Sequence, residues 1–219
     1  MNKPLKLSFV SDVACPWCAI GLASLGKALE NLDGEVAAQL HFEPFELNPQ
    51  MGPEGEDVTE HLTKKYGSTP EQQAASREAI RQRGAAVGFA FRKEGRGRVW
   101  NTFDAHRLLY WAGEQDEAKQ HALKRELLKA YHGEARNPSE RDVLLDCAAK
   151  AGLDRAQAAA VLDEKRYTEE VRERERHWQE HGIHAVPSVV VDDQYLIQGG
   201  QPPEVFEEAL REIARKRNA

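Results

Sequence analysis

The sequence predicts an α/β fold in which a β-α-β unit opens the chain, an all-helical stretch follows, and an α-β-β-α unit closes it. Short runs rich in β-forming residues lie near the two ends of the chain, at residues 5–10, 36–47 and 187–198. Between about residues 57 and 181, apolar residues recur almost entirely at helical spacing. A sheet built from both ends of the chain and interrupted by a helical insertion accounts for both observations.

The length and composition agree with this division. A chain of 219 residues suggests one large domain or two small ones. We expect residues 1–50 and 165–219 to form the α/β domain and residues 51–164 to form the inserted helical domain. The chain is 41% hydrophobic and 30% charged, which is ordinary for a soluble globular protein. Its formal net charge of -6 does not favour binding to nucleic acid or to an anionic membrane surface.

The sequence favours a cytoplasmic location. No apolar run approaches the roughly 20 residues of a membrane helix, and the first residues lack the apolar core and cleavage site of a signal peptide. We expect the cytoplasm unless a signal was removed ahead of this numbering. Reducing conditions there disfavour a purely structural disulfide. We expect the third cysteine, Cys147, to be inert on an apolar helical stripe.

The opening unit places two cysteines at its first junction. Leu5–Val10 predicts a strand, and apolar residues spaced by four, three and four positions then predict one face of a helix. These residues are Cys18, Leu22, Leu25 and Leu29. Asn31–Gly34 ends the helix with residues that tolerate turns, and Val36–Leu47 predicts the second strand. Cys15 and Cys18 therefore lie where the first strand gives way to the helix.

The middle of the chain predicts a series of helices. Thr69–Gln72 contains a capping residue, a proline for the first turn and a glutamine that completes a capping box, and Ser139–Asp142 predicts a similar start. Further helices are expected over Asn101–Gly113, Ala118–Tyr131 and Thr168–His181. The basic, glycine-rich segment Arg92–Arg98 lacks the strand and helix of a phosphate-binding loop, and we interpret it as a solvated surface loop.

The closing unit predicts a hairpin and a last helix. Pro187–Val191 and Tyr195–Gln198 predict two strands, joined by a turn at Asp192–Gln194. Gly199 and the following glycine end the hairpin, and the prolines at 202 and 203 open the helix. The residues expected to face inward from this helix are Val205, Phe206, Ala209, Leu210 and Ile213.

The cysteine pair could in principle bind a metal or carry redox chemistry. A structural zinc site needs four ligands, and the chain offers one cysteine pair. The histidines nearest to helical spacing are His177, His181 and His184. Gly182 is expected to end their helix, so we predict no metal site and interpret the histidines as an exposed helix end near a C-terminal dipole.

Redox chemistry suits the pair better. A thiolate is the nucleophile in disulfide exchange, and a helix N-terminus stabilises negative charge through free N–H groups and the helix dipole. Cys15 falls at that position, and Pro16 suits the first helical turn. We expect Cys15 to be the exposed nucleophile and Cys18, one turn further and on the apolar face, to be the resolving thiol.

These motifs resemble a known family. A strand, CPWC and a helix, followed much later by AVPSVVV and a closing helix, resemble the thioredoxin superfamily. The inserted helices make the chain similar to DsbA-type oxidoreductases. The segments SDVACPWCAIG, NTFDAHRLLYWA and GGQPPEVFEEAL resemble the FrnE-type branch of that family, and the resemblance covers nearly the whole chain.

The resemblance implies roles for the residues around the dithiol. Cys15 would attack and Cys18 would be its partner, while Pro187 would be a cis-proline facing the disulfide. That geometry would turn the backbone of Val186 outward, so that a substrate peptide could pair with it as an added strand. An ordinary trans proline at a strand start is the alternative. Within Pro16–Trp17, we expect the indole to lie exposed beside Cys15 as an apolar platform for substrate.

One departure from the family concerns proton transfer. Thioredoxin-like enzymes often carry a buried carboxylate six residues before the first active cysteine, where this chain has Phe9. Asp12 is the nearest candidate to accept a proton from Cys18, although a turn carboxylate is an equal interpretation. Its charge would raise the pKa of Cys15. His106, in a segment that lies near the active-site cleft in the family, could also be a plain core or surface histidine.

The sequence therefore predicts a cytoplasmic thiol–disulfide oxidoreductase, of the disulfide reductase or isomerase type, that works by mixed-disulfide exchange. We expect no metal or organic cofactor beyond the Cys15–Cys18 disulfide. Expected partners are protein or small-molecule disulfides and thiols, with thioredoxin or glutathione as reductant, and relatives are commonly homodimers. Because the dipeptide between the cysteines does not titrate, we expect a less oxidising couple than that of the periplasmic enzymes.

Two other functions stay open at this point. Kappa-class glutathione transferases and 2-hydroxychromene-2-carboxylate isomerases share the architecture, but they carry a serine where Cys15 stands. A glutathione pocket could persist beside the dithiol in this chain. The third alternative is a holdase or interaction module that uses the apolar cleft around Trp17.

Overall fold

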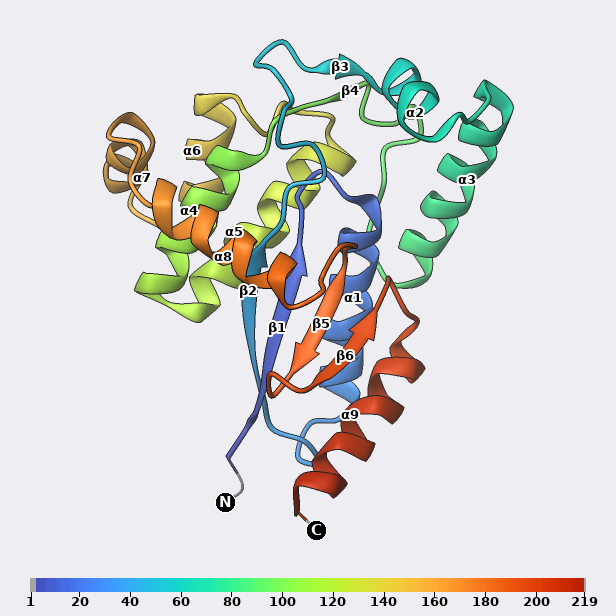
Figure 1. Cartoon of the computed structure of the whole chain (residues 1–219), viewed down its shortest axis with the longest axis vertical. Coiled ribbons are helices and arrows are strands. Elements are labelled where there is room, and N and C mark those ends of the chain that lie inside the picture. Colours follow the sequence, from blue (N-terminus) through green and yellow to red (C-terminus); the bar gives the residue numbers. More distant parts are fainter. Residues whose placement is uncertain (1–2, 219) are drawn as a thin grey trace.

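The computed structural model describes residues 3–218 and has the α/β architecture that the sequence predicts (Figure 1). Its main sheet contains β1 (Leu5–Ser11), β2 (Ala38–Pro44), β5 (Ser188–Val191) and β6 (Tyr195–Gln198) in the order β2-β1-β5-β6. β1 runs parallel to β2 and antiparallel to β5, which pairs antiparallel with β6. The two ends of the chain thus share one mixed sheet, and the predicted fold class is confirmed.

Two helices complete the thioredoxin-like unit. α1 (Pro16–Asn31) follows β1, and α9 (Pro203–Asn218) closes the chain and packs against α1 (Figure 1). Phe206, Leu210 and Ile213 of α9 are buried as expected. Val205 is 40% exposed, so its predicted inward orientation is wrong, because the buried stripe of α9 begins one residue later.

The insertion is helical, as predicted. Its helices are α2 (Val58–Tyr66), α3 (Pro70–Ala86), α4 (Phe103–Gln115), α5 (Glu117–Leu128), α6 (Arg141–Lys150) and α7 (Arg155–Asp163), and α8 (Thr168–Glu180) follows as the first helix of the predicted closing unit. The helices α4, α5 and α8 contact β2, the edge strand of the sheet. A short π-helical turn, η1 (Lys129–Gly133), follows α5, and a two-stranded sheet forms from β3 (Glu56–Asp57) and β4 (Arg98–Val99). The division at residues 51 and 164 stays a prediction.

Helix starts were predicted with mixed success. The Thr69 hydroxyl accepts from Gln72 N–H and the Gln72 side chain accepts from Thr69 N–H, so the capping box is confirmed. The start predicted at Ser139 is wrong, because its hydroxyl donates to the Asn137 side chain and α6 begins two residues later. The predicted strand at 36–47 is shorter in the structure, and the predicted helix ending at Tyr131 gives way to η1.

Two apolar cores meet at the loop that joins β1 to α1. The core around the sheet contains Cys15 and Cys18 together with residues such as Phe9, Phe42, Val189 and Phe206. The core of the helical insertion contains Val13 and Ala14 together with residues such as Leu108, Trp111, Leu127 and Tyr131. Because consecutive residues of one loop belong to two cores, the cysteine pair is held where the two parts of the fold join.

Candidate active site

Cys15 occupies the N-cap position of α1. Its backbone is extended (φ -90°, ψ 116°), and Pro16 stands at the first helical position, where a missing N–H costs nothing. The Cys18 N–H donates to the Cys15 carbonyl oxygen at 3.1 Å, which brings the second cysteine one turn behind the first. Both thiols are free. The structure thus places the pair at the helix tip.

The exposure of Cys15 differs from the prediction. The side chain is 4% exposed and that of Cys18 is 0% exposed, so the expected exposed nucleophile is buried. Both cysteines belong to the apolar cluster around the sheet, against which Trp17 and Val186 also pack.

The two thiols differ in acidity. The Cys18 thiol donates a hydrogen bond that lowers the pKa of Cys15; burial and the charge of Asp12 oppose this, and the backbone N–H groups of Cys18 and Trp17 assist it. Burial raises the pKa of Cys18 well above its ordinary value, and Cys15 raises it further. The Cys15 sulfur is thus the better nucleophile, and the Cys18 thiol keeps its proton to a higher pH.

The segment before β5 faces the dithiol. The Val186–Pro187 peptide bond is cis, and the Cys15 thiol donates to the Val186 carbonyl oxygen at 3.6 Å. Gly21 of α1 lies against the proline ring, since a Cβ built on it would be 3.0 Å from Pro187 Cγ. The absence of a side chain at residue 21 lets helix α1 and the cis-proline approach each other closely.

Pro16 and Trp17 are both partly buried, so Trp17 is less open than predicted. The guanidinium of Arg83, from α3, lies over the indole with its carbon 5.4 Å from the ring centroid. Gly200 also approaches Trp17 closely, since an added Cβ would lie 3.0 Å from the Trp17 carbonyl oxygen and 3.3 Å from Cε3 of the indole. The indole is therefore held between the insertion and the glycine pair that follows β6.

Asp12 is completely buried just before the cysteines. Its Oδ1 accepts from Ala14 N–H at 2.9 Å and from the Thr102 hydroxyl at 2.7 Å, and its Oδ2 accepts from Leu47 N–H at 2.7 Å. Burial alone would raise the pKa of Asp12, but the adjacent His106 ring and these N–H groups outweigh it and lower the pKa. The Asp12 carboxylate is therefore ionised and fully hydrogen-bonded. It stabilises the loop before Cys15 and is poorly suited to accept a proton from Cys18.

His106 lies beside Asp12 rather than on a surface cleft. Its side chain is 2% exposed, and its Nε2 is 3.5 Å from Asp12 Oδ1. Phe9, at the position where related enzymes often carry a carboxylate, is 0% exposed and packs edge-on against Phe42 with the ring centroids 5.8 Å apart. The floor beneath the cysteines is therefore apolar on the side of the sheet.

Sequence reasoning missed two groups that hold the loop before Cys15. The His132 ring, from η1, hydrogen-bonds through Nε2 to the Val13 carbonyl oxygen at 2.9 Å. Arg96 donates to the Ala14 carbonyl oxygen and lies over the Tyr131 ring. The segment Arg92–Arg98, which the sequence led us to interpret as a solvated surface loop, thus places the Arg96 side chain against the loop before Cys15. Burial, with the charge of Arg96, lowers the pKa of His132 to about 3, so His132 is the neutral donor.

A third missed residue is Lys124 of α5, which is 0% exposed and whose charge acts on Cys18. Its position on the same helical stripe as Gln120 and Leu128, four residues away on either side, was a signal in the sequence. Cys147 is buried as expected, and burial raises its pKa to about 11.

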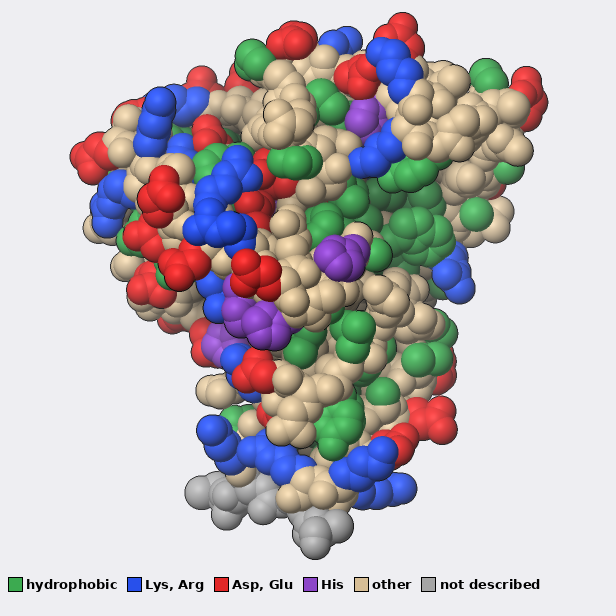
Figure 2. Space-filling model, in the orientation of Figure 1, with side chains coloured by type: hydrophobic (Ala, Val, Ile, Leu, Met, Phe, Trp, Pro, Cys, Tyr) green, Lys and Arg blue, Asp and Glu red, His purple; other side chains and the backbone are tan. Residues whose placement is uncertain are grey.

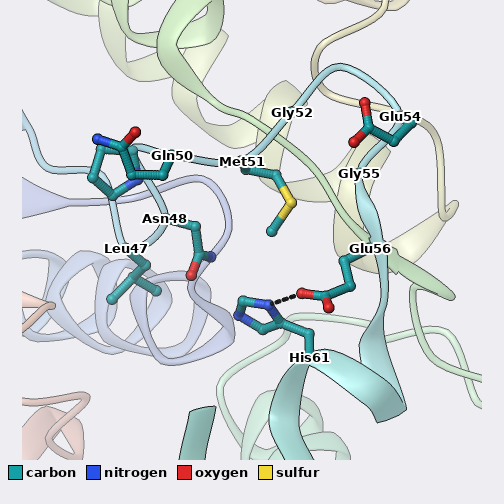
Figure 3. A pocket seen from close by; sticks show the side chains of 10 residues that line it. Leu47, Asn48, Gln50, Met51, Gly52, Glu54, Gly55, Glu56 and His61 are labelled. Atoms are coloured by element: carbon teal, nitrogen blue, oxygen red, sulfur yellow. Dashed lines mark hydrogen bonds and ion pairs between the residues drawn. The ribbon is translucent and has the colours of Figure 1, made fainter. Parts of the chain in front are cut away.

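Two hollows lie near these elements. The loop that follows β2, tied to Asp12 through Leu47, lines a pocket of about 490 Å³, in which Asn48 and Met51 point toward His61 (Figure 3). The His61 ring contacts Glu56 at 2.7 Å. A groove of about 1190 Å³ lies among α1, the segment after α3, and α5. On the face in view, hydrophobic side chains gather over the upper end of α1 and the inner side of α3 (Figure 2).

Within residues 3–218, no three His, Cys, Asp or Glu side chains are grouped so as to hold a metal ion. No helix in the described part of the chain has the length and apolar character needed to cross a bilayer.

Known proteins resemble this chain over most of its length. The family described as DSBA-like thioredoxin domain matches residues 6–211. A probable DsbA oxidoreductase of Streptomyces coelicolor is 35% identical, with a TM-score of 0.86 over 95% of this chain and 89% of that one. The uncharacterized protein YwbO of Bacillus subtilis (strain 168) is 26% identical over 214 residues, which are 97% of this chain and 99% of YwbO.

More distant structures share the fold alone. A 2-hydroxychromene-2-carboxylate isomerase is 15% identical, with a TM-score of 0.71 over 97% of this chain and 98% of that one. The cytosolic disulfide reductase DsbM of Pseudomonas aeruginosa, in a structure with GSH, is 19% identical, with a TM-score of 0.64 over 96% of this chain and 99% of DsbM. The family match and the Streptomyces relative, together with the dithiol at the tip of α1, lead to one conclusion: the chain belongs to the DSBA-like thioredoxin domain family of thiol–disulfide oxidoreductases.

Proposed function

We propose that this protein is a cytoplasmic thiol–disulfide oxidoreductase of the disulfide reductase or isomerase type, with Cys15 and Cys18 as its redox couple. The observation that carries the proposal is the arrangement of the pair. Cys15 stands at a helix N-terminus with a lowered pKa, and Cys18 stands behind it with a raised pKa. Thiol–disulfide exchange requires two such sulfurs, because one attacks the substrate disulfide and the other resolves the mixed disulfide.

The reaction follows from that geometry. The Cys15 thiolate attacks a substrate disulfide, forms a mixed disulfide and releases one substrate thiolate. Cys18 then loses its proton and attacks the Cys15 sulfur, which releases the second substrate thiolate and leaves the Cys15–Cys18 disulfide. A substrate peptide would lie along the backbone of Val186 beside cis-Pro187 and contact Pro16 and Trp17.

Reduction of the enzyme would come from glutathione or a thioredoxin system, with no metal or organic cofactor. The likeness to DsbM, whose structure contains GSH, supports glutathione as a co-substrate. The lack of a titrating group in Pro16–Trp17 supports a reducing couple. The assignment to the FrnE-type branch, a homodimeric state, and the cytoplasmic location are parts of this proposal that rest on sequence resemblance.

The glutathione-dependent isomerase is the second candidate, favoured by the shared fold. The intact Cys15–Cys18 pair speaks against it, since the related enzymes are expected to carry serine at the first position. A holdase has less support, because Trp17 is partly buried between its neighbours.

One titration tests the proposal. The protein is equilibrated in glutathione redox buffers, and its free thiols are trapped and counted by mass spectrometry. A potential between about -270 mV, as in thioredoxin, and about -180 mV, as in protein disulfide isomerase, would support a reductase or isomerase. A potential near -120 mV would identify an oxidant instead, and failure to form the Cys15–Cys18 disulfide would contradict redox function altogether.

A further inference from the structure

Lys124 is a buried lysine without a partner. Its side chain is 0% exposed, and its Nζ has no hydrogen-bond partner among the described residues. Lysine is rarely buried in this way, because an ammonium group loses its hydration and needs a counter-charge or acceptors. A retained buried lysine therefore calls for an explanation beyond packing.

Neighbouring residues on α5 fix where Lys124 points. One turn earlier, the Gln120 side chain accepts from Phe42 N–H at 3.1 Å and donates to the Phe42 carbonyl oxygen at 3.4 Å. One turn later, Leu128 enters the apolar cluster that contains Phe42 and Cys18. The Lys124 Nζ lies 6.0 Å from the centroid of the Phe42 ring. The lysine thus reaches from the insertion into the core behind the dithiol.

Among the described residues, neither Phe9 nor Asp12 is suited to accept the proton of the inner thiol. Phe9 occupies the sheet position below the cysteines and contributes only a ring, which packs against Phe42. Asp12 is held by the Ala14 and Leu47 N–H groups and the Thr102 hydroxyl, and it has a lowered pKa. Cys18 is 0% exposed, so bulk water does not reach it in this state.

We infer that Lys124 is the proton-exchange partner of Cys18, a role that rests on the proposed oxidoreductase function and adds to it a base supplied by the helical insertion. In substrate reduction, the Cys18 thiol gives its proton to the neutral Lys124 amine. The Cys18 thiolate attacks the Cys15 sulfur of the mixed disulfide, so that an S–S bond forms between the cysteines and the bond to substrate breaks.

Protons and electrons balance over the cycle. Two electrons pass from the dithiol to the substrate disulfide, and the two released substrate thiolates take protons from solvent. Lys124 remains as an ammonium group beside the Cys15–Cys18 disulfide. When two thiols such as glutathione reduce that disulfide, Cys18 leaves as a thiolate and recovers the proton from Lys124, while the two attacking thiols give their protons to solvent.

The electrostatics of the site agree with this exchange. Burial lowers the pKa of Lys124, and burial raises the pKa of Cys18, so the two acidities move toward each other. The titratable or charged groups that act on Lys124 are Cys15 and Cys18 from α1, Asp12 from the preceding loop, and His132 from η1. His132 stays neutral over the relevant range because burial lowers its pKa to about 3.

The test compares Lys124→Met and Lys124→Gln with Lys129→Met in the full chain. Lys129 follows α5 in η1 with a side chain that is 60% exposed, so it controls for the loss of a lysine. Disulfide reduction is measured against pH. We expect both Lys124 variants to resolve the mixed disulfide about tenfold or more slowly near neutral pH. The deficit should shrink as pH rises toward the pKa of the Cys18 thiol, because the thiolate then forms without Lys124, and Lys129→Met should follow the wild type.

A second measurement does not depend on activity. In a Cys15→Ser, Cys147→Ala background Cys18 is the sole thiol, and its thiolate absorbance is titrated with and without Lys124→Met. We expect the pKa of Cys18 to rise when the lysine is removed. Replacing a buried amine that has no hydrogen-bond partner among the described residues should leave folding intact, and Lys124→Gln serves if the methionine variant is recovered poorly.

The outcomes separate the two proposals. An unchanged Cys18 titration together with a wild-type rate and pH profile would overturn the role of Lys124, as would an activity loss that is equal at every pH, which indicates a structural effect. A wild-type protein without reductase activity would overturn the proposed function, while a shifted Cys18 titration would still uphold the coupling between Lys124 and Cys18.

Discussion

The sulfur of Cys15 lies 3.6 Å from the carbonyl oxygen of Val186, a residue that is 171 positions later in the chain and precedes the cis-proline. The contact joins the two halves of the sheet across the whole helical insertion. It places the backbone available to a substrate peptide directly beside the sulfur that would attack. The surroundings of Cys15 therefore include backbone from the opposite end of the chain.

The two cysteines should behave differently when they are replaced singly. We expect Cys18→Ser to accumulate a mixed disulfide at residue 15 with oxidised glutathione, because attack proceeds and resolution is lost. Cys15→Ser should form no adduct near neutral pH, because burial raises the pKa of Cys18. Intact-mass spectrometry measures the adducts. Cys147→Ala should react as the wild type does, and an adduct of equal yield in Cys15→Ser would refute the assigned roles.

Asp12 should tune both the nucleophile and the stability of the loop. Its charge raises the pKa of Cys15, so Asp12→Asn should lower that pKa and speed alkylation of Cys15 in mildly acidic buffer. The asparagine amide cannot accept from both N–H groups and the hydroxyl, so we expect a loss of about 1–3 kcal/mol in unfolding free energy. Asp33→Asn, at an exposed site, should change neither quantity.

The Asp12 carboxylate also predicts how the free energy of unfolding changes in acid. Because the folded pKa of Asp12 is below its ordinary value of 3.8, its contribution is fully present above that value and is lost as pH falls through the lower folded pKa. Urea unfolding of the wild type should therefore weaken relative to Asp12→Asn only in strongly acidic buffer. A constant difference between the two proteins across that range would contradict the lowered pKa.

The His132 ring predicts that the free energy of unfolding also depends on pH over a higher range than that of Asp12. Its folded pKa is about 3, below the ordinary 6.5, so the unfolded chain binds a proton that the folded chain does not. The associated stability is present above about pH 6.5 and falls by about 1.4 kcal/mol per pH unit as pH drops toward 3. His132→Gln should lack this slope in urea denaturation, whereas His184→Gln, at an exposed site, should keep it. A wild-type slope in His132→Gln would show that folding does not lower the pKa of His132.

The fold and the cysteine pair could be predicted because their signals are local. Strand and helix spacing, the proline after Cys15 and the capping box at Thr69 are each written within a few residues. Contacts between residues far apart in the chain leave weaker signals in the sequence. Ser139 carries the residue type of a helix start, but Asn137 competes for its hydroxyl. The burial of Cys15 could not be foreseen, because it depends on an apolar cluster that brings residues from both ends of the chain together only on folding.

The supporting groups of the site were missed for the same reason. Arg96 lies in a segment whose composition is typical of a surface loop, and only the fold brings its guanidinium to the Ala14 carbonyl. Lys124 looks like one lysine of a charged helix until α5 packs on β2 and closes the core around it. Sequence reasoning recognised the missing carboxylate at Phe9, but it could not show that a replacement comes from the insertion.

Two glycines of α1 give a matched pair for the contact between the helix and the cis-proline. A Cβ on Gly26 meets nothing within 4 Å, so Gly26→Ala should raise the free energy of unfolding by about 1 kcal/mol through helix propensity. A Cβ on Gly21 would lie 3.0 Å from Pro187 Cγ and 3.4 Å from Gly200 Cα. We expect Gly21→Ala to lose about 1 kcal/mol or more, because the proline ring has to move.

The displacement of Pro187 should also slow thiol exchange at Cys15. Moving Pro187 shifts the Val186 carbonyl away from the Cys15 sulfur, so Gly21→Ala should form the mixed disulfide with oxidised glutathione more slowly than Gly26→Ala. Urea denaturation and stopped-flow thiol exchange measure the two effects on the same preparations. If Gly21→Ala matched Gly26→Ala in both, the contact between α1 and the cis-proline would have no role in positioning the Val186 carbonyl beside Cys15.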